Sequence, residues 1–322
     1  MLNFVINRIA SAGILLIGLL TIVFIISHLA PGDPVTALIS PSIPSAVADK
    51  LRRQFGLDQP LLAQYGHWLK NTLSGELGIS FRHQRSVMEV IANFLPKTMM
   101  LGFTAICLEL VVGLLLGLLA VRYYGSILDK MVSNLGLIVY TLPTFWIGLV
   151  LLAFFSYALG LLPSSQMHSI NAENLSFTGR AFDLFKHLIL PALTIALPGA
   201  AGIARYFRTS LLKVQREEYV MFAQSLGLSK SKIFFFYELR NALAPVITIV
   251  GLEIGTLLAG AIVAETMFAW PGMGRLAVMA IFSRDYPLVM GCTLVSGVVV
   301  VLGNFVADVF YMLLDPRVRP QK

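Results

Sequence analysis

The chain has 322 residues, of which 57% are hydrophobic and only 13% are charged, with a formal net charge of +7. A soluble domain carries roughly a quarter charged residues, so the composition excludes an ordinary soluble enzyme and favours a membrane-embedded bundle. The positive charge does not indicate a nucleic-acid partner, because basic residues that flank membrane spans orient them.

Six apolar stretches are long enough to cross a membrane as helices, which takes about 20 residues each. The first, residues 9–30, is too long for the core of a signal peptide and lacks a small-residue cleavage site. We therefore expect residues 1–30 to form the N-terminus and a retained first span. The other five stretches cover approximately residues 98–121, 131–160, 187–206, 245–266 and 288–314. The sequence thus predicts an all-α integral membrane protein with six transmembrane helices.

The long segment between the first two spans, residues 31–97, has the features of a small folded appendage. Two stretches in it, "SAVADKLRRQFG" and "LLAQYGHWLKNTL", have apolar residues at helical spacing. Pro60 and Gly75 mark breaks beside the second stretch. We expect this appendage to precede a five-helix core, residues 98–314, and a short tail, residues 315–322.

Lysine and arginine in the loops predict the orientation, since short cytoplasmic loops carry an excess of both. Basic residues gather after the second span, after the fourth span and in the C-terminal tail: Arg122 and Lys130; Arg205, Arg208, Lys213, Arg216, Lys230, Lys232 and Arg240; and Arg317, Arg319 and Lys322. Both termini and the stretch after the fourth span are therefore predicted to be cytoplasmic, and residues 31–97 extracytoplasmic.

Proline interrupts two of the predicted spans, at Pro143 in the third and at Pro191 and Pro198 in the fourth, and glycines recur in the fifth. Small residues allow helices to approach closely, so ordinary helix packing is one interpretation. Non-helical backbone inside a membrane must be covered by protein or face a cavity. The alternative is therefore a bundle that bends to open a pathway.

The stretch "EEYVMFAQSLGLSKSKIFFFYELRNALAP", residues 217–245, is polar although it joins two apolar spans. Its first part predicts a short amphipathic helix, because apolar residues recur at i, i+3, i+4 and i+7: Tyr219, Phe222, Ala223 and Leu226. Such a helix could dock on a cytoplasmic partner, lie on lipid headgroups, or fold back on its own bundle.

Signals for a turn follow this short helix. Gly227 can end it in a left-handed conformation. Ser229 or Ser231 can cap a second helix, which runs to Pro245 at the start of the fifth span. This order predicts a helix, a glycine turn and a second helix joined rigidly to a span, which could transmit movement into the bundle.

Three acidic residues fall within predicted spans: Glu109, Glu253 and Asp308. An ionisable side chain inside a membrane is a candidate functional group, although such groups are also commonly hydrogen-bonded between helices. Glu253, in the glycine-rich fifth span, is the favoured candidate for a substrate pathway, whereas Glu109 and Asp308 fit structural roles better. We expect no catalytic residue in this chain.

The histidines are scattered and lack the paired spacing of metal ligands, so no metal site is expected: His28, His67, His83, His168 and His187. The stretch "FAWPGMGR", residues 268–275, predicts a turn before the sixth span. In that turn, Trp270 could equally be an anchor in the membrane interface.

The segment around Gly227 resembles the EAA loop of permease subunits from binding-protein-dependent ABC importers. That pattern reads E-A-A, three residues, Gly, nine residues and then I-x-L-P. When it is aligned on Gly227, this chain matches the pattern at Ala223 and Leu239 and departs from it at Met221, Phe222, Tyr237 and Arg240.

The chain is more similar to the peptide/nickel branch of that family, which shows "DYV…A…GLS…LRNA…P" here. The resemblance extends along nearly the whole sequence, through "HLAPGDPV", "FGLDQPLLAQY", "LGISF", "LPTFWIG", "HLILPALT", "ETMFAWPGMGR", "RDYPLV" and "LLDPRVR". The order of these motifs makes the match specific.

The resemblance implies a type I ABC importer permease fold with a cytoplasmic coupling loop at residues 207–244. In this family such a loop is similar to a helix seated in a groove of an ATPase subunit. It would here use Tyr219, Phe222, Ala223 and Leu226 for contact and Gly227 for the turn.

The resemblance also implies partners in the bacterial cytoplasmic membrane. These are a second related permease, two cytoplasmic ATPase subunits that carry ATP and Mg, an extracytoplasmic solute-binding protein, and the surrounding lipid. The chain has no G-x-x-x-x-G-K-[ST] phosphate loop, so we expect it to hold no cofactor and to be a transport subunit rather than an enzyme.

The expected substrates are di- or oligopeptides, and nickel or a metal chelate is the nearest alternative. A self-sufficient secondary carrier or channel would show inverted repeats or charged relay chains. A membrane-embedded enzyme would show a motif such as H-E-x-x-H. The sequence has none of these features.

Overall fold

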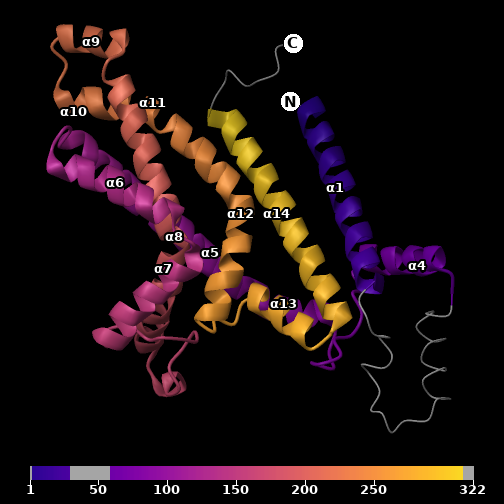
Figure 1. Cartoon of the computed structure of the whole chain (residues 1–322). Helices are drawn as coiled ribbons and strands as arrows, with labels where there is room; N and C mark the ends of the chain where they lie inside the picture. Colours follow the sequence, from indigo (N-terminus) through magenta and orange to yellow (C-terminus); the bar gives the residue numbers. More distant parts are fainter. Residues whose placement is uncertain (1, 30–58, 315–322) are drawn as a thin grey trace. The chain divides into compact units, whose positions relative to one another are not determined.

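The computed structural model describes residues 2–29 and 59–314. Within that range, the side chains of residues 2–8, 27–29, 252–260 and 306–314 lie outside the description. The chain is helical (Figure 1) and forms two compact units, Met1–Thr98 with Pro271–Val301 and Met99–Trp270 with Leu302–Lys322. Helices α5 (Val87–Arg122) and α14 (Tyr286–Leu314) contribute residues to both units.

By length and apolar composition, five helices of the described chain could cross a membrane, or six if one bent pair is counted as a single span. The five are α1 (Leu2–Leu29), α5, α8 (Phe177–Val214), the helix that runs from residue 230 into α12 (Ala244–Met267), and α14. The all-α, multi-span prediction is therefore confirmed.

Two helices are longer than the predicted spans. Helix α5 begins at Val87, inside the predicted appendage, and α8 covers 38 residues where the sequence predicted a span over residues 187–206. Hydropathy identifies only the most apolar part of a helix, whereas capping decides where it begins. At the start of α8, the Ser176 hydroxyl accepts a hydrogen bond from the Gly179 N–H at 3.2 Å. The first part of the predicted coupling loop, residues 207–214, belongs to this helix.

The third predicted span, residues 131–160, is broken at Pro143, the proline that interrupts it in the sequence, so it is not one continuous helix. Helix α6 (Ile127–Thr141) ends there, and α7 (Thr144–Leu151) continues into a π-helical segment, η1 (Leu152–Ala158), with a bend of 112° between the two parts. Leu142 is extended, with ψ 140°, because the ring of a following proline disfavours helical backbone.

The first unit contains α1, α4 (Leu61–Leu73), α13 (Met273–Phe282) and the adjoining parts of α5 and α14. Helix α4 coincides with the second stretch predicted in the appendage, whereas the first, residues 45–56, lies outside the described residues. Asp285 is fully buried and accepts hydrogen bonds from the Ser80 hydroxyl at 2.5 Å and the Arg82 N–H at 3.1 Å. These bonds hold the turn before α5 against the start of α14.

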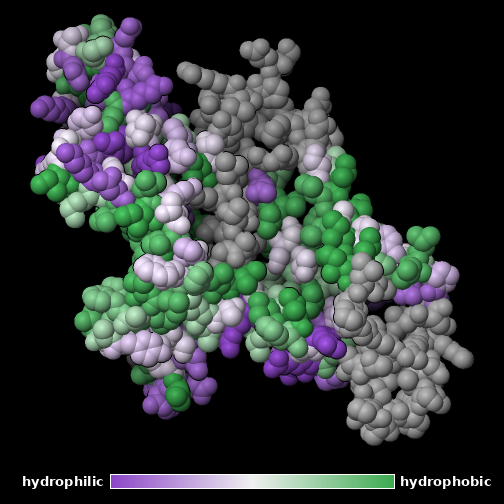
Figure 2. Space-filling model, in the orientation of Figure 1, coloured by the Kyte–Doolittle hydropathy of each residue, from purple (hydrophilic) through white to green (hydrophobic). Residues whose placement is uncertain are grey.

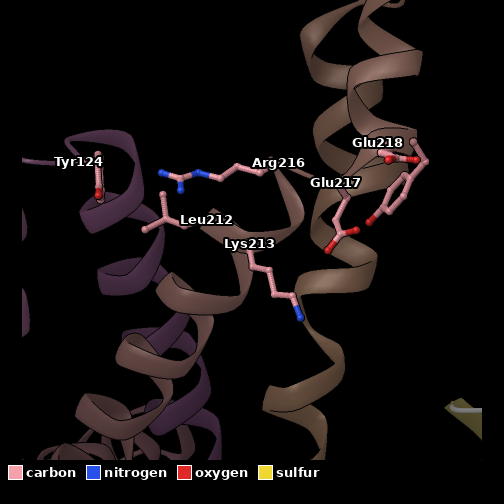
Figure 3. A pocket seen from close by; sticks show the side chains of 7 residues that line it. Tyr124, Leu212, Lys213, Arg216, Glu217 and Glu218 are labelled. Atoms are coloured by element: carbon pink, nitrogen blue, oxygen red, sulfur yellow. The ribbon is translucent and has the colours of Figure 1, made fainter.

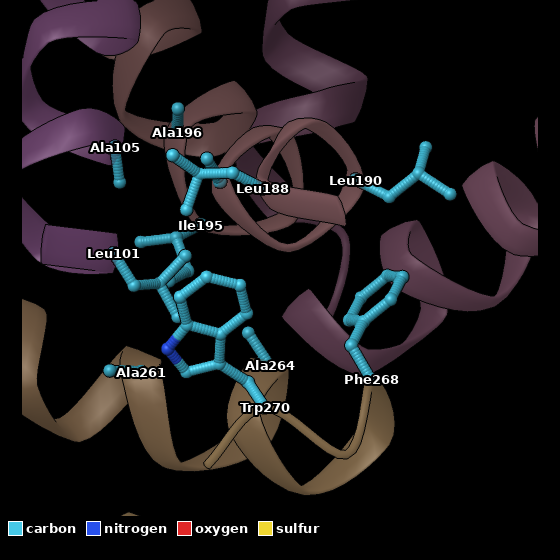
Figure 4. Packing of buried hydrophobic residues seen from close by; sticks show 11 residues of the cluster. Leu101, Ala105, Leu188, Leu190, Ile195, Ala196, Ala261, Ala264, Phe268 and Trp270 are labelled. Atoms are coloured by element: carbon cyan, nitrogen blue, oxygen red, sulfur yellow. The ribbon is translucent and has the colours of Figure 1, made fainter. Parts of the chain in front are cut away.

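The second unit is built around α8, most of whose apolar window is buried. One apolar cluster at its N-terminal half includes Leu101, Leu190, Ala264 and Trp270 (Figure 4). Because Trp270 is fully buried, the alternative that placed it as an interfacial anchor is wrong, and it is a core residue. The turn that carries it is fixed by a 2.7 Å hydrogen bond from the Gln166 N–H to the Phe268 carbonyl.

Close packing of α5 against α8 depends on two glycines of α5. A Cβ atom added at Gly113 would lie 2.7 Å from the Ile203 side chain, and one at Gly117 would lie 2.8 Å from the Ala204 carbonyl oxygen. Small residues spaced four apart let two helices approach in this way. Small residues therefore serve close helix packing in this pair of helices, which the sequence analysis did not single out.

Candidate functional site

The polar stretch after α8 folds as a short helix, a turn and a second short helix. We call α9 (Glu218–Ser225), the turn at Gly227 and α10 (Lys230–Ile233) the elbow. It sits beside the end of α8 and the start of α12, which places it between two helices that are long enough to span a membrane.

The inner face of α9 is made by Val220, which is fully buried, and Ala223, which is 2% exposed. Both belong to an apolar cluster with residues from the end of α8, from the single turn α11 (Arg240–Ala242) and from the start of α12: Phe207, Leu211, Val214, Ala242 and Val246. The elbow is thus packed against both helices at once. The link between the elbow and the two helices is thus a packed apolar cluster.

Ala223 therefore does not share a face with the rest of its predicted stripe. Tyr219, Phe222 and Leu226 are 39%, 65% and 62% exposed. Helical spacing alone could not distinguish the two faces, because Ala223 lies at the edge of the stripe. Sequence reasoning missed Val220, although its position three residues before Ala223 puts both on one side of a helix.

Gly227 ends α9 as predicted, with a left-handed φ of +74°. The Gly227 N–H donates to the Gln224 carbonyl at 3.0 Å, and the Leu228 N–H donates to the Ala223 carbonyl at 3.4 Å. This is the Schellman arrangement, which satisfies the last carbonyls of a helix and needs a residue that tolerates positive φ.

The second half of the elbow leads into α12 almost without interruption. Of the two predicted caps, Ser229 is the one used, and its hydroxyl accepts from the Lys232 N–H at 3.4 Å. Helix α10 continues through a π-helical segment, η3 (Phe234–Leu239), and a single turn, α11 (Arg240–Ala242). The Gln215 side chain at the end of α8 donates to the Glu238 carboxylate at 3.1 Å, which ties η3 to α8.

A cavity of about 760 Å³ opens beside the start of α9 (Figure 3). Its lining combines two cations and two anions with aromatic and aliphatic side chains: Tyr124, Leu212, Lys213, Arg216, Glu217, Glu218 and Tyr219. Burial and the negative charge of Glu217 raise the pKa of the Tyr219 phenol, so that side chain stays neutral at physiological pH. A lining of mixed charge fits a polar protein segment better than a free anion.

The elbow and η3 also carry exposed apolar side chains. Besides Phe222 and Leu226, Phe235 and Phe236 on η3 are 61% and 71% exposed. Figure 2 shows that hydrophilic residues dominate the surface around α9 and α10, with hydrophobic ones among them. Exposed aromatic groups gathered in such a surface are candidates for contact with lipid or with another protein.

A bidentate ion pair, which the sequence did not reveal, braces α6 against α8 near the cavity. Arg208 donates from Nε and Nη2 to the two Asp129 carboxylate oxygens at 2.6 and 2.9 Å. The Gly125 N–H also donates to this carboxylate at 3.0 Å, and the Arg208 guanidinium lies over the Tyr124 ring. In the sequence, Arg208 counts only toward the positive charge that orients the spans, and the residues near Asp129 give no sign of a partner in another helix.

Of the three acidic side chains in the spans, the structure describes only that of Glu109. Glu109 is 4% exposed and packs against Gly199 of α8, at a position where any side chain on residue 199 would overlap its carboxylate. Glu253 and Asp308 lie in α12 and α14, and their side chains fall outside the described residues. The pathway role of all three stays a prediction, and the surroundings of Glu109 are those of a group packed between helices.

Two of the histidines that look scattered in the sequence meet at Asp183. The His168 Nδ1 lies 3.1 Å from the Asp183 carboxylate, and the His187 Nδ1 lies 2.8 Å from the Asp183 carbonyl oxygen. The Ser169 hydroxyl and N–H donate to the same carboxylate at 2.5 and 3.0 Å. Among the described residues, no three side chains of His, Cys, Asp or Glu are grouped so as to hold a metal ion, and Asp183 fastens the preceding loop to α8.

Comparison with known families gives two matches that together cover nearly the whole chain. Residues 110–320 match the family described as binding-protein-dependent transport system inner membrane component. Residues 1–102 match the N-terminal region of the corresponding membrane components.

Similar proteins from three bacteria match over almost their full length. The oligopeptide transport system permease protein AppB of Bacillus subtilis is 36% identical over 99% of each chain. The di/tripeptide transport system permease protein DppB of Pseudomonas aeruginosa is 37% identical over 100% of each. The probable D,D-dipeptide transport system permease protein DdpB of Escherichia coli is 38% identical over 94% of this chain and 93% of its own.

Among solved structures, a chain of the MetNI methionine ABC transporter in an inward-facing conformation is similar in fold. The TM-score is 0.55 at 18% identity, and the match covers 71% of this chain and 97% of the other. At that identity the likeness concerns the fold alone.

Proposed function

The chain belongs to the family of binding-protein-dependent transport system inner membrane components, and we propose that it forms part of the translocation path for di- or oligopeptides. It is a multi-pass permease subunit of a bacterial ABC importer, not an enzyme. The peptide substrate rests on the names of relatives that match over nearly their whole length. Those names favour peptides over nickel or a metal chelate.

An importer of this class works with ATPase and solute-binding partners. We propose two ATPase subunits, which bind the ATP and Mg that this chain does not hold, and a second related permease that completes the path. We also propose that the elbow and both termini lie on the cytoplasmic side, as the distribution of basic residues indicates. Glu253 is the proposed polar group of the path in α12.

The observation that carries the coupling role is that α9 has one buried face and one exposed apolar face. Its inner residues, Val220 and Ala223, are packed against α8 and α12, while Phe222 and Leu226 are exposed. An ATPase subunit that covers the exposed side would bury those apolar groups, which stabilises the contact by roughly 25 cal/mol per Å². When the ATPases close, the push on α9 reaches α12 through its packed face.

Reconstitution with candidate partners tests this function. The chain should be purified with its partner permease and ATPases, placed in proteoliposomes, and supplied with the solute-binding protein and a labelled dipeptide or tripeptide. We expect uptake that requires ATP hydrolysis and the binding protein.

Matched controls separate the alternatives. Uptake that persists without the ATPase subunits would indicate a secondary carrier. Nickel uptake or nickel-stimulated ATP hydrolysis, with no response to peptides, would contradict the peptide assignment while leaving the importer class intact.

A further inference from the structure

Helix α4 is amphipathic, and only part of its apolar side is covered. The Tyr65 hydroxyl lies 2.7 Å from the Thr21 hydroxyl of α1, and the rings of Tyr65 and Trp68 lie 5.2 and 5.5 Å from the Phe24 ring. Leu62 and Leu73 of the same helix are 86% and 75% exposed. These two leucines are left without a partner in the described chain.

The angular positions of the α4 residues explain this division. At 3.6 residues per turn, Leu62, Leu69 and Leu73 lie side by side, next to the face that holds Tyr65 and Trp68 against α1. The opposite side carries polar groups, among them His67 and Asn71. One stripe thus contacts α1, the adjoining stripe is apolar and uncovered, and the remainder is hydrophilic.

The depth of the contact with α1 identifies what lies beside the uncovered stripe. The apolar window of α1 covers Ile9–Ile26, so Phe24 and Thr21 lie two and five residues before its end. At 1.5 Å per residue these positions are about 3 and 8 Å inside the window. Interfacial helices place their apolar face about 5–10 Å into the boundary between headgroups and acyl chains, a range that overlaps these depths.

The direction of α4 agrees with that depth. Figure 1 shows α4 beside the C-terminal end of α1 and running across its axis, as expected for a helix that lies in the membrane plane beside one that crosses it. Gly75, with a φ of +84°, ends α4 directly after Ser74, and the chain then turns toward α5.

We propose that α4 is a membrane-surface helix that places Leu62, Leu69 and Leu73 in the lipid at the end of the membrane opposite the N-terminus. Tyr65 and Trp68 fix this helix to α1 at the level of the headgroups, where aromatic side chains are enriched. The partner is the lipid itself. The helix would hold the outer end of α1 at a defined depth and angle.

Spin labels on the two sides of α4 test the proposal. Leu62 and Asn71 are nine residues apart, which places them on opposite sides of a helix, so Leu62→Cys and Asn71→Cys are a matched pair. The exposed Cys107 should first be replaced by serine, whereas the buried Cys292 can stay. The labelled chain is measured within the complete importer, in nanodiscs of phosphatidylethanolamine and phosphatidylglycerol.

The measurement is how strongly each spin label is relaxed by collisions with oxygen, which partitions into lipid, and by collisions with a water-soluble nickel chelate. We expect the label at residue 62 to favour oxygen several-fold more than the label at residue 71. Equal preference for the nickel chelate at both positions would overturn the proposal, because the stripe would then face water. Protection of residue 62 from both reagents would also overturn it, since another protein subunit would then cover α4.

Discussion

At the scale of single residues, Gly227 is the clearest link between backbone conformation and the coupling role. A Cβ atom at this position would meet nothing within 4 Å, so space does not require a glycine there. The requirement comes from the φ of +74°, which residues with a Cβ atom adopt at a cost. Gly227 was predictable from sequence, because a glycine after an amphipathic segment is a common helix end.

Replacement of Gly227 by valine should therefore uncouple the importer. A β-branched residue held in the left-handed region costs about 1–3 kcal/mol, which corresponds to roughly a 5- to 150-fold loss in the population of the native turn. Peptide uptake per ATP hydrolysed should fall, or the ATPase should dissociate during purification. Both quantities can be measured in the reconstituted system.

Gly227→Asn is the matched control, because asparagine tolerates positive φ far better than valine and the site has room for its side chain. It should retain most of the uptake. Equal uptake by the valine variant and the unmodified chain would show that the turn does not depend on this conformation.

The residue-scale errors have one physical cause. Ala223 was placed on the contact stripe and Trp270 was given an interfacial alternative, yet both are buried. The faces of α9 and of the turn before α13 are decided by contacts with distant segments. Such contacts cannot be deduced from the local periodicity of the sequence. The same holds for Asp129 and Arg208, which are 79 residues apart in sequence.

At the scale of helices, close packing of α5 on α8 is the feature most open to a mutational test. Gly117→Ala should destabilise the protein, because the new methyl group would lie 2.8 Å from the Ala204 carbonyl oxygen and 3.0 Å from the Phe207 ring. Overpacking of this kind costs about 1–3 kcal/mol. The measurement is the temperature at which the purified protein in detergent loses its monodisperse peak on size exclusion.

Gly102→Ala, on the same helix, controls for the change in helix propensity. Nothing lies within 4 Å of a Cβ atom at Gly102, so this variant should be neutral or more stable by up to about 1 kcal/mol. If the two alanine variants melted at the same temperature, the close approach of α5 and α8 would be refuted.

The sequence predicted where long helices occur, but it did not predict which of them are broken. Apolar runs of sufficient length marked every long helix, and α4 was predicted over the residues that it occupies. Prolines behaved differently from case to case. Pro143 breaks the third span, while α8 continues through Pro191 and Pro198, because α8 is surrounded by neighbours that hold it helical.

At the scale of the whole molecule, the proposed coupling requires that force pass from the ATPase subunits to the membrane spans. In the proposed importer, ATP is hydrolysed on partner subunits, and the substrate path lies among the spans. The elbow, packed against α8 and α12, is the proposed connection between them. The sequence motifs indicated this role, but they could not show which residues face the partner and which face the bundle, since that division depends on tertiary packing.

Photo-crosslinking from Phe222 tests the central claim most directly. A photoreactive amino acid is placed at residue 222, which is 65% exposed on the elbow, or at Phe177, which is 88% exposed at the start of α8. Both variants are illuminated in the transporting complex with ATP present. The account predicts that residue 222 captures an ATPase subunit and that residue 177 does not. Capture of lipid alone from residue 222, or of the ATPase from residue 177 instead, would contradict it.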